Sequence, residues 1–276
     1  MAARPGPPEP TERWVRLDGI IGDPMASRDE IVRFCDELLD AGSWNDYGPN
    51  GLQVPGGAAV AKVATGVSAH LELLERAVAS GAQLVLVHHG LFWNAHPRAL
   101  SEQMAARLRV ALDAGLSVAA YHLPLDAHPE IGNNALLCAG LGFEPGGSFG
   151  EVAGRPVGVV GRSEAGVEAA QLFRRVGELV AREPLVFDAG PERVRSIGIV
   201  SGGASSQVHD AVALGLDAFL TGEPAEHAMA DAREGRVHFI AAGHYATETL
   251  GVRRLGELVA ARFGVEHEFI DVPNPV

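Results

Sequence analysis

The sequence predicts an α/β fold: two interlinked, similarly built lobes from an internal duplication, with mostly parallel sheets covered by helices. Short apolar runs alternate with amphipathic segments along most of the 276 residues, and this alternation is typical of parallel strands joined by helical crossovers. Two stretches also recur in altered form. A-V-A-S-G-A at 77–82 resembles A-V-A-L-G-L at 211–216, and A-A-Y-H-L-P-L-D at 119–126 resembles A-A-G-H-Y-A-T-E at 241–248. The repeated order of elements favours duplication.

Bulk composition limits the class of protein. With 47% apolar and 21% charged residues, the chain can bury a sizeable core. A formal net charge of −13 argues against a nucleic-acid groove, although bound metal ions could still attract a small anionic substrate. The two cysteines, Cys35 and Cys138, are too few for a disulfide framework and indicate reduced thiols in a cytoplasmic protein. The sequence shows no apolar run of membrane-spanning length, so we expect a soluble chain.

The first lobe is predicted at 27–145, after an extension at 1–24 that is rich in proline and charge and is expected to be disordered. Ile31, Phe34 and Leu38 recur at helical spacing, so a helix begins at Ser27 and ends before Gly42. A polar loop follows at 44–54. The other expected elements are strands at 63–67, 84–87 and 117–121 and helices at 69–80, 101–114 and about 133–139.

The second lobe is predicted at 146–240, and residues 241–276 are expected to pack back near the site on the first lobe. The stretch from 146 to 195 contains strand candidates and a helix at 167–181. The repeated unit then predicts strands at 196–200, 218–220 and 237–241, with helices at 207–214 and 226–234.

Four histidines follow the expected strands directly: His88, His89, His122 and His244. Ligand sites in sheets of this kind lie beyond the carboxyl ends of the strands. If the two lobes face each other through these ends, the four imidazoles can meet in one cleft. This shared placement is the strongest indication of a site.

The adjacent pair His88-His89 closes the apolar run L-V-L-V. Neighbours within a strand point to opposite faces, but before Gly90 the backbone can turn and aim both rings into one cleft. Two histidines hydrogen-bonded to backbone carbonyls are the alternative. The strand end and the acids elsewhere favour metal ligands.

Each of the other two histidines has a carboxylate four residues later. Glu248 follows His244 at the start of a predicted helix, where it can bridge two ions or simply cap the helix. Asp126 follows His122, and Pro124 between them favours an extended loop over a helix. Asp126 is expected to be a ligand. His122 can be a further ligand, a proton carrier or a group that orients Asp126.

Together these groups offer nitrogen and oxygen but no thiolate, a set that suits zinc, manganese, iron or nickel. The expected ligands are His88, His89, Asp126, His244 and Glu248, and His122 is the expected catalytic residue. Two divalent ions that share a hydroxide would perform hydrolysis.

Several other features have weaker implications. The loop S-G-G-A-S-S at 201–206 can cradle phosphate but lacks a lysine, so a tight turn is favoured. The segment T-G-E-P-A-E-H at 221–227 is expected to cap a helix or line the cleft. Trp93 can stack on a flat ring or belong to the core. Arg98, Arg253 and Arg254 are candidate cations for a phosphate group.

Four motifs resemble the NIF-three-like family of dinuclear-metal proteins, whose members are frequently named GTP cyclohydrolase 1 type 2 homologues. They are N-D-Y-G-P-N-G-L-Q-V (45–54), L-V-L-V-H-H-G-L-F-W (84–93), Y-H-L-P-L-D-A-H-P-E-I-G-N-N-A (121–135) and A-A-G-H-Y-A-T-E-T-L-G-V-R-R-L-G (241–256). The resemblance extends from Ser27 to the C-terminus and is to the short form without an inserted domain.

The resemblance implies a homohexameric toroid of α/β subunits with two metal ions each, held by the five ligands above with Glu248 bridging. It also implies hydrolytic opening of the guanine imidazole ring of GTP, with loss of formate. Two other functions remain open: a general hydrolase of phosphoesters or amides, and a metal-binding scaffold or regulator without catalytic activity.

Overall fold

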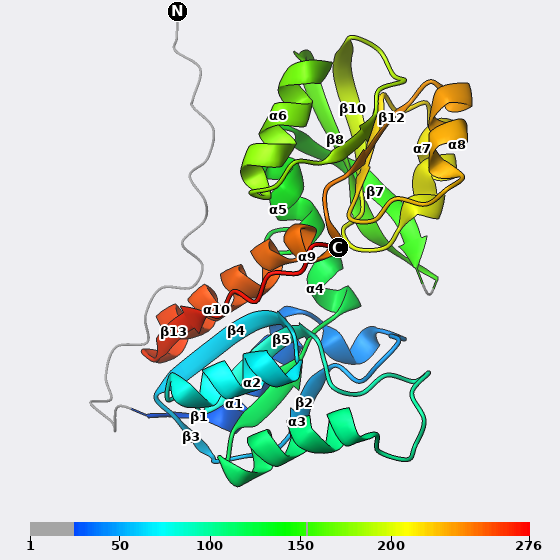
Figure 1. Cartoon of the computed structure of the whole chain (residues 1–276). Coiled ribbons are helices and arrows are strands. Elements are labelled where there is room, and N and C mark those ends of the chain that lie inside the picture. Colours follow the sequence, from blue (N-terminus) through cyan, green and yellow to red (C-terminus); the bar gives the residue numbers. More distant parts are fainter. Residues whose placement is uncertain (1–24, 153) are drawn as a thin grey trace, which may run out of the picture.

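A computed structural model describes residues 25–152 and 154–276. The extension predicted to be disordered at 1–24 lies outside these described residues. Figure 1 shows two lobes, each built around its own sheet, with the helices α4 (Leu123–Ala127) and α10 (Thr249–Phe263) where the lobes meet. The α/β fold predicted from the sequence is confirmed.

The first sheet has the strand order β13-β4-β5-β6-β2, in which β2 pairs antiparallel to β6 and the other pairings are parallel. A short antiparallel pair, β1 with β3, lies outside this sheet. The elements that build this lobe are β1 (Ala26–Ser27), α1 (Arg28–Leu38), η1 (Ala41–Ser43), β2 (Gly51–Val54), β3 (Ala59–Val60), β4 (Lys62–Ser68), α2 (Leu71–Ala79), β5 (Leu84–His89), α3 (Glu102–Asp113), β6 (Ser117–Ala120) and β13 (Glu266–Phe269).

The second sheet has the order β7-β8-β10-β11-β12-β9. Its centre is parallel, whereas β7, β8 and β9 are attached by antiparallel pairings. The remaining elements are α5 (Asn133–Gly140), β7 (Glu144–Val152), β8 (Arg155–Glu168), α6 (Ala169–Leu179), β9 (Leu185–Phe187), β10 (Arg193–Ile199), η2 (Ser205–Gln207), α7 (Val208–Ala213), β11 (Ala218–Thr221), α8 (Ala228–Gly235), β12 (His238–Ala241) and α9 (His244–Thr247).

The centres of the two sheets are built in the same way. In the first lobe β4, β5 and β6 are parallel neighbours connected through α2 and α3, and in the second lobe β10, β11 and β12 are connected in the same way through α7 and α8. Consequently the carboxyl ends of three parallel strands are available in each lobe for a site.

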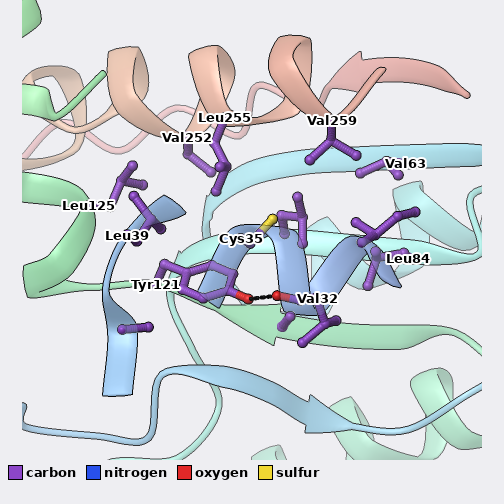
Figure 2. Close-up of a cluster of buried hydrophobic side chains, with 14 of the residues drawn as sticks. Val32, Cys35, Leu39, Val63, Leu84, Tyr121, Leu125, Val252, Leu255 and Val259 are labelled. Carbon is purple, nitrogen blue, oxygen red and sulfur yellow. Dashed lines mark hydrogen bonds between the residues drawn. The ribbon is translucent and has the colours of Figure 1, made fainter. Parts of the chain in front are cut away.

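The long helix α10 links the lobes by packing. Its residues Val252, Leu255 and Val259 are fully buried against β4 and α1 in the cluster drawn in Figure 2. The same cluster includes Tyr121, whose hydroxyl lies 3.2 Å from the carbonyl oxygen of Val32. This packing fixes the chain at the end of β6, directly before the predicted site residue His122.

Helix α5 follows the site residue Asp126 and belongs to the core of the second sheet. Leu137, Cys138 and Leu141 are completely buried with β-strand residues such as Ile197 and Ile199. The chain therefore passes from the first core to the second close to Asp126. Among the described residues, the structure contains no helix of the length and apolarity that crossing a membrane requires.

Candidate metal centre

All the site residues predicted from the sequence meet where the strand ends of the two lobes face each other. His88 and His89 are the last residues of β5, and β6 leads into His122 and then Asp126 in α4. From the second lobe, β12 leads into His244 and Glu248 at the two ends of α9.

Glu248 lies at the centre of this cluster. Its Oε1 is 3.5 Å from Nε2 of His88 and 3.2 Å from Nε2 of His244. Its Oε2 is 3.2 Å from Nε2 of His89. Asp126 adds Oδ2 at 3.4 Å from Nε2 of His88. Three overlapping groups have their ligand atoms within 4.8 Å of one another: His88, His89 and His122; His89, His244 and Glu248; His88, Asp126 and Glu248.

Each histidine of the cluster is held through Nδ1 by a different partner. His88 Nδ1 lies 3.0 Å from the carbonyl oxygen of Tyr121, and His89 Nδ1 lies 3.0 Å from the Ser68 hydroxyl. His122 Nδ1 lies 2.7 Å from Asp46 Oδ1, and His244 Nδ1 contacts Glu223 Oε1. In a neutral ring, oxygen acceptors on Nδ1 favour the tautomer whose Nε2 carries a free lone pair, which is how proteins orient metal-binding histidines.

Asp126 is held in a matching way. The side-chain amide of Asn133 donates to Asp126 Oδ1 at 2.8 Å, and the Ser201 hydroxyl donates to the same oxygen at 3.0 Å. Both neighbours occupy Oδ1, so Oδ2 remains directed at His88. Asn133 belongs to α5 and Ser201 follows β10, so the second lobe orients a carboxylate supplied by α4.

The donor atoms fit a metal ion, because two of them are buried and have no hydrogen-bond partner among the described residues: His88 Nε2 and Glu248 Oε2. The side chain of His88 is 0% exposed and that of Glu248 is 3% exposed. Leaving a buried polar atom unsatisfied is costly, and a cation between these atoms would remove the cost.

The electrostatics of the cluster also favour a cation. Burial raises the pKa of Glu248, but the histidines around it outweigh burial and hold this pKa well below its usual range. Burial, assisted by the other histidines, lowers the pKa of His89 to about 3. Glu248 is therefore an anion at pH 7, and His89 is neutral.

One local prediction was wrong. Residues 123–127 are helical, because Pro124 lies in the first turn of α4, where its missing N–H is not needed. Glu248 lies at the start of a helix as expected, where it joins α9 to α10. Its carboxylate does not cap α10 and is directed at the histidines.

The loop at 201–206 supports the cluster. Gly202 has a left-handed φ of +68°, and its N–H donates to Thr247 Oγ1 at 3.1 Å. A Cβ atom at Gly202 would come within 2.5 Å of Glu248 Oε1, so only glycine permits this approach.

Two residues of the segment at 221–227 belong to different clusters. Glu223 holds His244, whereas His227 forms a separate exposed group with His209 and Asp231 on α7 and α8.

A cavity of about 620 Å³ opens beside the cluster. Its lining includes His89, His122, Asp126, His244 and Glu248, together with Trp93, which lies edge-on to His122 at 5.1 Å between ring centroids. The three arginines suggested as cations for a phosphate group lie elsewhere. Arg253 stacks on Phe269 and Arg254 pairs with Glu257, and neither they nor Arg98 lines this cavity.

Sequence reasoning missed the residues that orient the cluster. Asp46, Asn133, Ser201 and Glu223 each lie in a segment that the sequence distinguishes for another reason. A single polar residue in such a segment carries no periodic signal. The position of Asp46 in the polar loop at 44–54, and that of Glu223 in a segment expected to cap a helix or line the cleft, could have suggested a role.

The family model described as Duf34/NIF3 (NGG1p interacting factor 3) matches residues 26–275. The chain belongs to the DUF34/NIF3 family. A family relative from Pseudomonas aeruginosa, named GTP cyclohydrolase 1 type 2 homolog, is 44% identical over 245 residues, which cover 89% of this chain and 97% of the relative. The resemblance inferred from the four motifs is thereby confirmed.

Two solved structures share this fold. A structural-genomics structure of the protein ybgI, titled as of unknown function, has a TM-score of 0.86 and 39% identity and covers 91% of this chain and 100% of its own. TTHA1606 from Thermus thermophilus has a TM-score of 0.83 and 33% identity, with the same coverage. The family and the fold are therefore established, and the His, Asp and Glu groups described above could bind metal ions.

Proposed function

We propose that this chain is a hydrolase that holds two divalent metal ions, with His88, His89, Asp126, His244 and Glu248 as ligands and Glu248 as the bridge. The observation that carries the proposal is a pair of buried atoms, His88 Nε2 and Glu248 Oε2, that have no hydrogen-bond partner in residues 25–152 and 154–276 and lie inside a cluster of oriented imidazoles. A nitrogen and oxygen donor set of this kind suits zinc, manganese, iron or nickel.

Two ions in this position would lower the pKa of water toward neutrality and stabilise the oxygens of a hydrolytic transition state. The chain itself supplies the orientation. Tyr121 and Ser68 hold His88 and His89 in position, and Asn133 with Ser201 fixes Asp126. The open side of the cluster is the cavity, where a substrate has access to it.

His122 is proposed to carry a proton. Its Nδ1 is bound to the buried Asp46, and its ring lines the cavity. A carboxylate behind an imidazole stabilises the ring when it gains a proton at Nε2. Burial raises the pKa of Asp46, but the hydrogen bond with His122 and its charge outweigh burial and lower it, so this carboxylate remains ionised.

The proposed substrate is the purine ring of GTP, opened with loss of formate. Support comes from the name of the relatives, GTP cyclohydrolase 1 type 2 homolog, and from Trp93 at the cavity, where it can pack against a flat ring. The experiment loads the full chain with each candidate metal and measures formate released from GTP.

Glu248→Gln is expected to reduce formate release at least about a hundredfold, because the bridge would lose its charge. Glu257→Gln is the matched control, since Glu257 lies exposed on α10 and pairs with Arg254. Hydrolysis of phosphoesters or amides without GTP turnover would show that GTP is not the substrate. Metal binding without any hydrolysis would refute the enzymatic activity and favour a metal-binding scaffold.

We also propose that the chain assembles as a homohexameric toroid in the cytoplasm, as the family resemblance implies. Sedimentation equilibrium tests the assembly against the 28.9 kDa of one chain. A species of one or two chains at micromolar concentration would contradict it.

A further inference from the structure

The cavity beside the cluster has an uneven charge distribution. Among the described residues that line it, Arg107 is the only lysine or arginine, and the carboxylates Asp126 and Glu248 both face histidines. The wall with Arg107 is therefore positive, in a chain whose net charge is −13.

Arg107 lies on α3, and its side chain is half-buried. Within the described residues its guanidinium has no hydrogen bond or ion pair, although a guanidinium has five N–H donors and usually finds acceptors. The structure leaves these donors available to a ligand in the cavity.

His70 lines the same cavity and is oriented by the backbone. Its Nδ1 accepts a hydrogen bond from the N–H of Leu73 at 3.3 Å, at the start of α2. A neutral ring with an accepting Nδ1 carries its proton on Nε2. Burial first and the charge of Arg107 second lower the pKa of His70, which keeps the ring neutral.

We propose that Arg107, assisted by the Nε2–H of His70, binds one anionic group of the substrate, a phosphate or a carboxylate, in the cavity beside the histidine and carboxylate cluster. This inference rests on the proposed function, since it assigns a substrate class to the same site. A guanidinium fork matches the two oxygens of one such group. A single cation serves a single anionic group, so Arg107 would hold one of the three phosphates of GTP, the proposed substrate.

The test measures binding and not turnover, so that its outcome is separate from that of the hydrolase proposal. Inorganic phosphate and acetate are titrated into the zinc-loaded full chain by calorimetry. Arg107→Ala is expected to weaken the binding of the preferred anion about tenfold, which is the effect of losing one charge-assisted contact. Arg109→Ala is the matched control, because Arg109 is exposed on the same helix. The better-bound probe identifies the anion as phosphate or carboxylate.

A second arm compares guanosine monophosphate with GTP, and equal affinities within about threefold are expected from one subsite. Equal anion binding by the Arg107 and Arg109 variants would overturn the proposal, as would a wild-type chain that binds neither probe. GTP binding more than about tenfold tighter than the monophosphate would overturn the single-anion assignment. Absence of any hydrolysis, with Arg107-dependent anion binding intact, would refute the hydrolase and leave the subsite.

Discussion

At the scale of single residues, Asp46 can be separated from metal binding. Its side chain is 1% exposed, its Oδ1 holds His122, and its Oδ2 accepts from the N–H of Leu123 at 2.9 Å. Asp46→Asn keeps an oxygen for His122 but removes the negative charge that would stabilise a protonated ring. We expect the hydrolysis rate to fall about tenfold to a hundredfold while the zinc content is unchanged.

The control for this change is Asp188→Asn, which alters a second histidine–carboxylate pair, His238 Nδ1 with Asp188 Oδ1 at 2.9 Å, away from the cluster. Rates and metal content are measured on the same preparations. Equal hydrolysis rates for the two variants would show that His122 does not carry the proton.

The charges of His88 and His244 predict that metal binding depends on pH. Burial lowers the pKa of each ring, but the neighbouring carboxylates outweigh burial and raise it to about 9. These pKa values exceed the ordinary 6.5, so the metal-free chain keeps both protons at pH 7. Their stabilising effect on folding is complete below pH 6.5 and is lost as the pH rises through 9.

A metal ion must displace these protons. We therefore expect zinc affinity to increase from pH 7 to pH 9 and zinc binding at pH 7 to release protons. Competition with a chromophoric chelator measures the affinity, and calorimetry in buffers of different ionisation enthalpy measures the protons. An affinity that does not change over this range would contradict the assignment of His88 and His244 as ligands.

At the scale of elements, the loop after β10 brings the backbone of Gly202 close to the Glu248 carboxylate. Gly202→Ala would place a methyl group 2.5 Å from Glu248 Oε1. We expect zinc affinity to fall about tenfold, in the range observed for residues that orient ligands.

Gly215→Ala is a fitting control, because Gly215 has a similar φ of +62° but open space within 4 Å of the added Cβ. Both variants should lose about 1 kcal/mol of folding free energy from the left-handed backbone, whereas only Gly202→Ala should lose zinc. Metal titration and chemical unfolding of both chains separate the two effects. Similar zinc affinities for the two variants would show that the loop can move away from Glu248 to accommodate the methyl group.

The placement of elements was largely predictable because it follows from periodicity. The parallel strands and their crossover helices lie within a few residues of their expected positions, and the histidines at the ends of β5, β6 and β12 followed from them. The wrong prediction at Pro124 has a physical cause: the first turn of a helix tolerates proline, and sequence alone does not show where a turn begins. Contacts such as Asn133 with Asp126 depend on the meeting of two lobes, which no local pattern encodes.

At the scale of the whole molecule, the chain crosses between the lobes twice, and each crossing carries part of the cluster. The first crossing runs from β6 through α4 to α5 and contains His122 and Asp126. The second runs from β12 through α9 to α10 and contains His244 and Glu248 before β13 rejoins the first sheet. Ions held by both crossings would tie the two lobes together.

Zinc is therefore expected to stabilise the entire fold and not only the loops that bind it. At a free zinc concentration of about a hundred times Kd, the gain is about 2.7 kcal/mol, which corresponds to a rise in Tm of about 5–10 °C for a chain of this size. Differential scanning calorimetry with zinc or with chelator measures the shift. Glu248→Gln should lose most of it, whereas Glu257→Gln should retain it, because Glu257 is exposed on α10. Hydrogen exchange should slow at both crossings together when zinc binds. Protection confined to one crossing would mean that the ions bind within a single lobe, and the argument for a shared centre would then be lost.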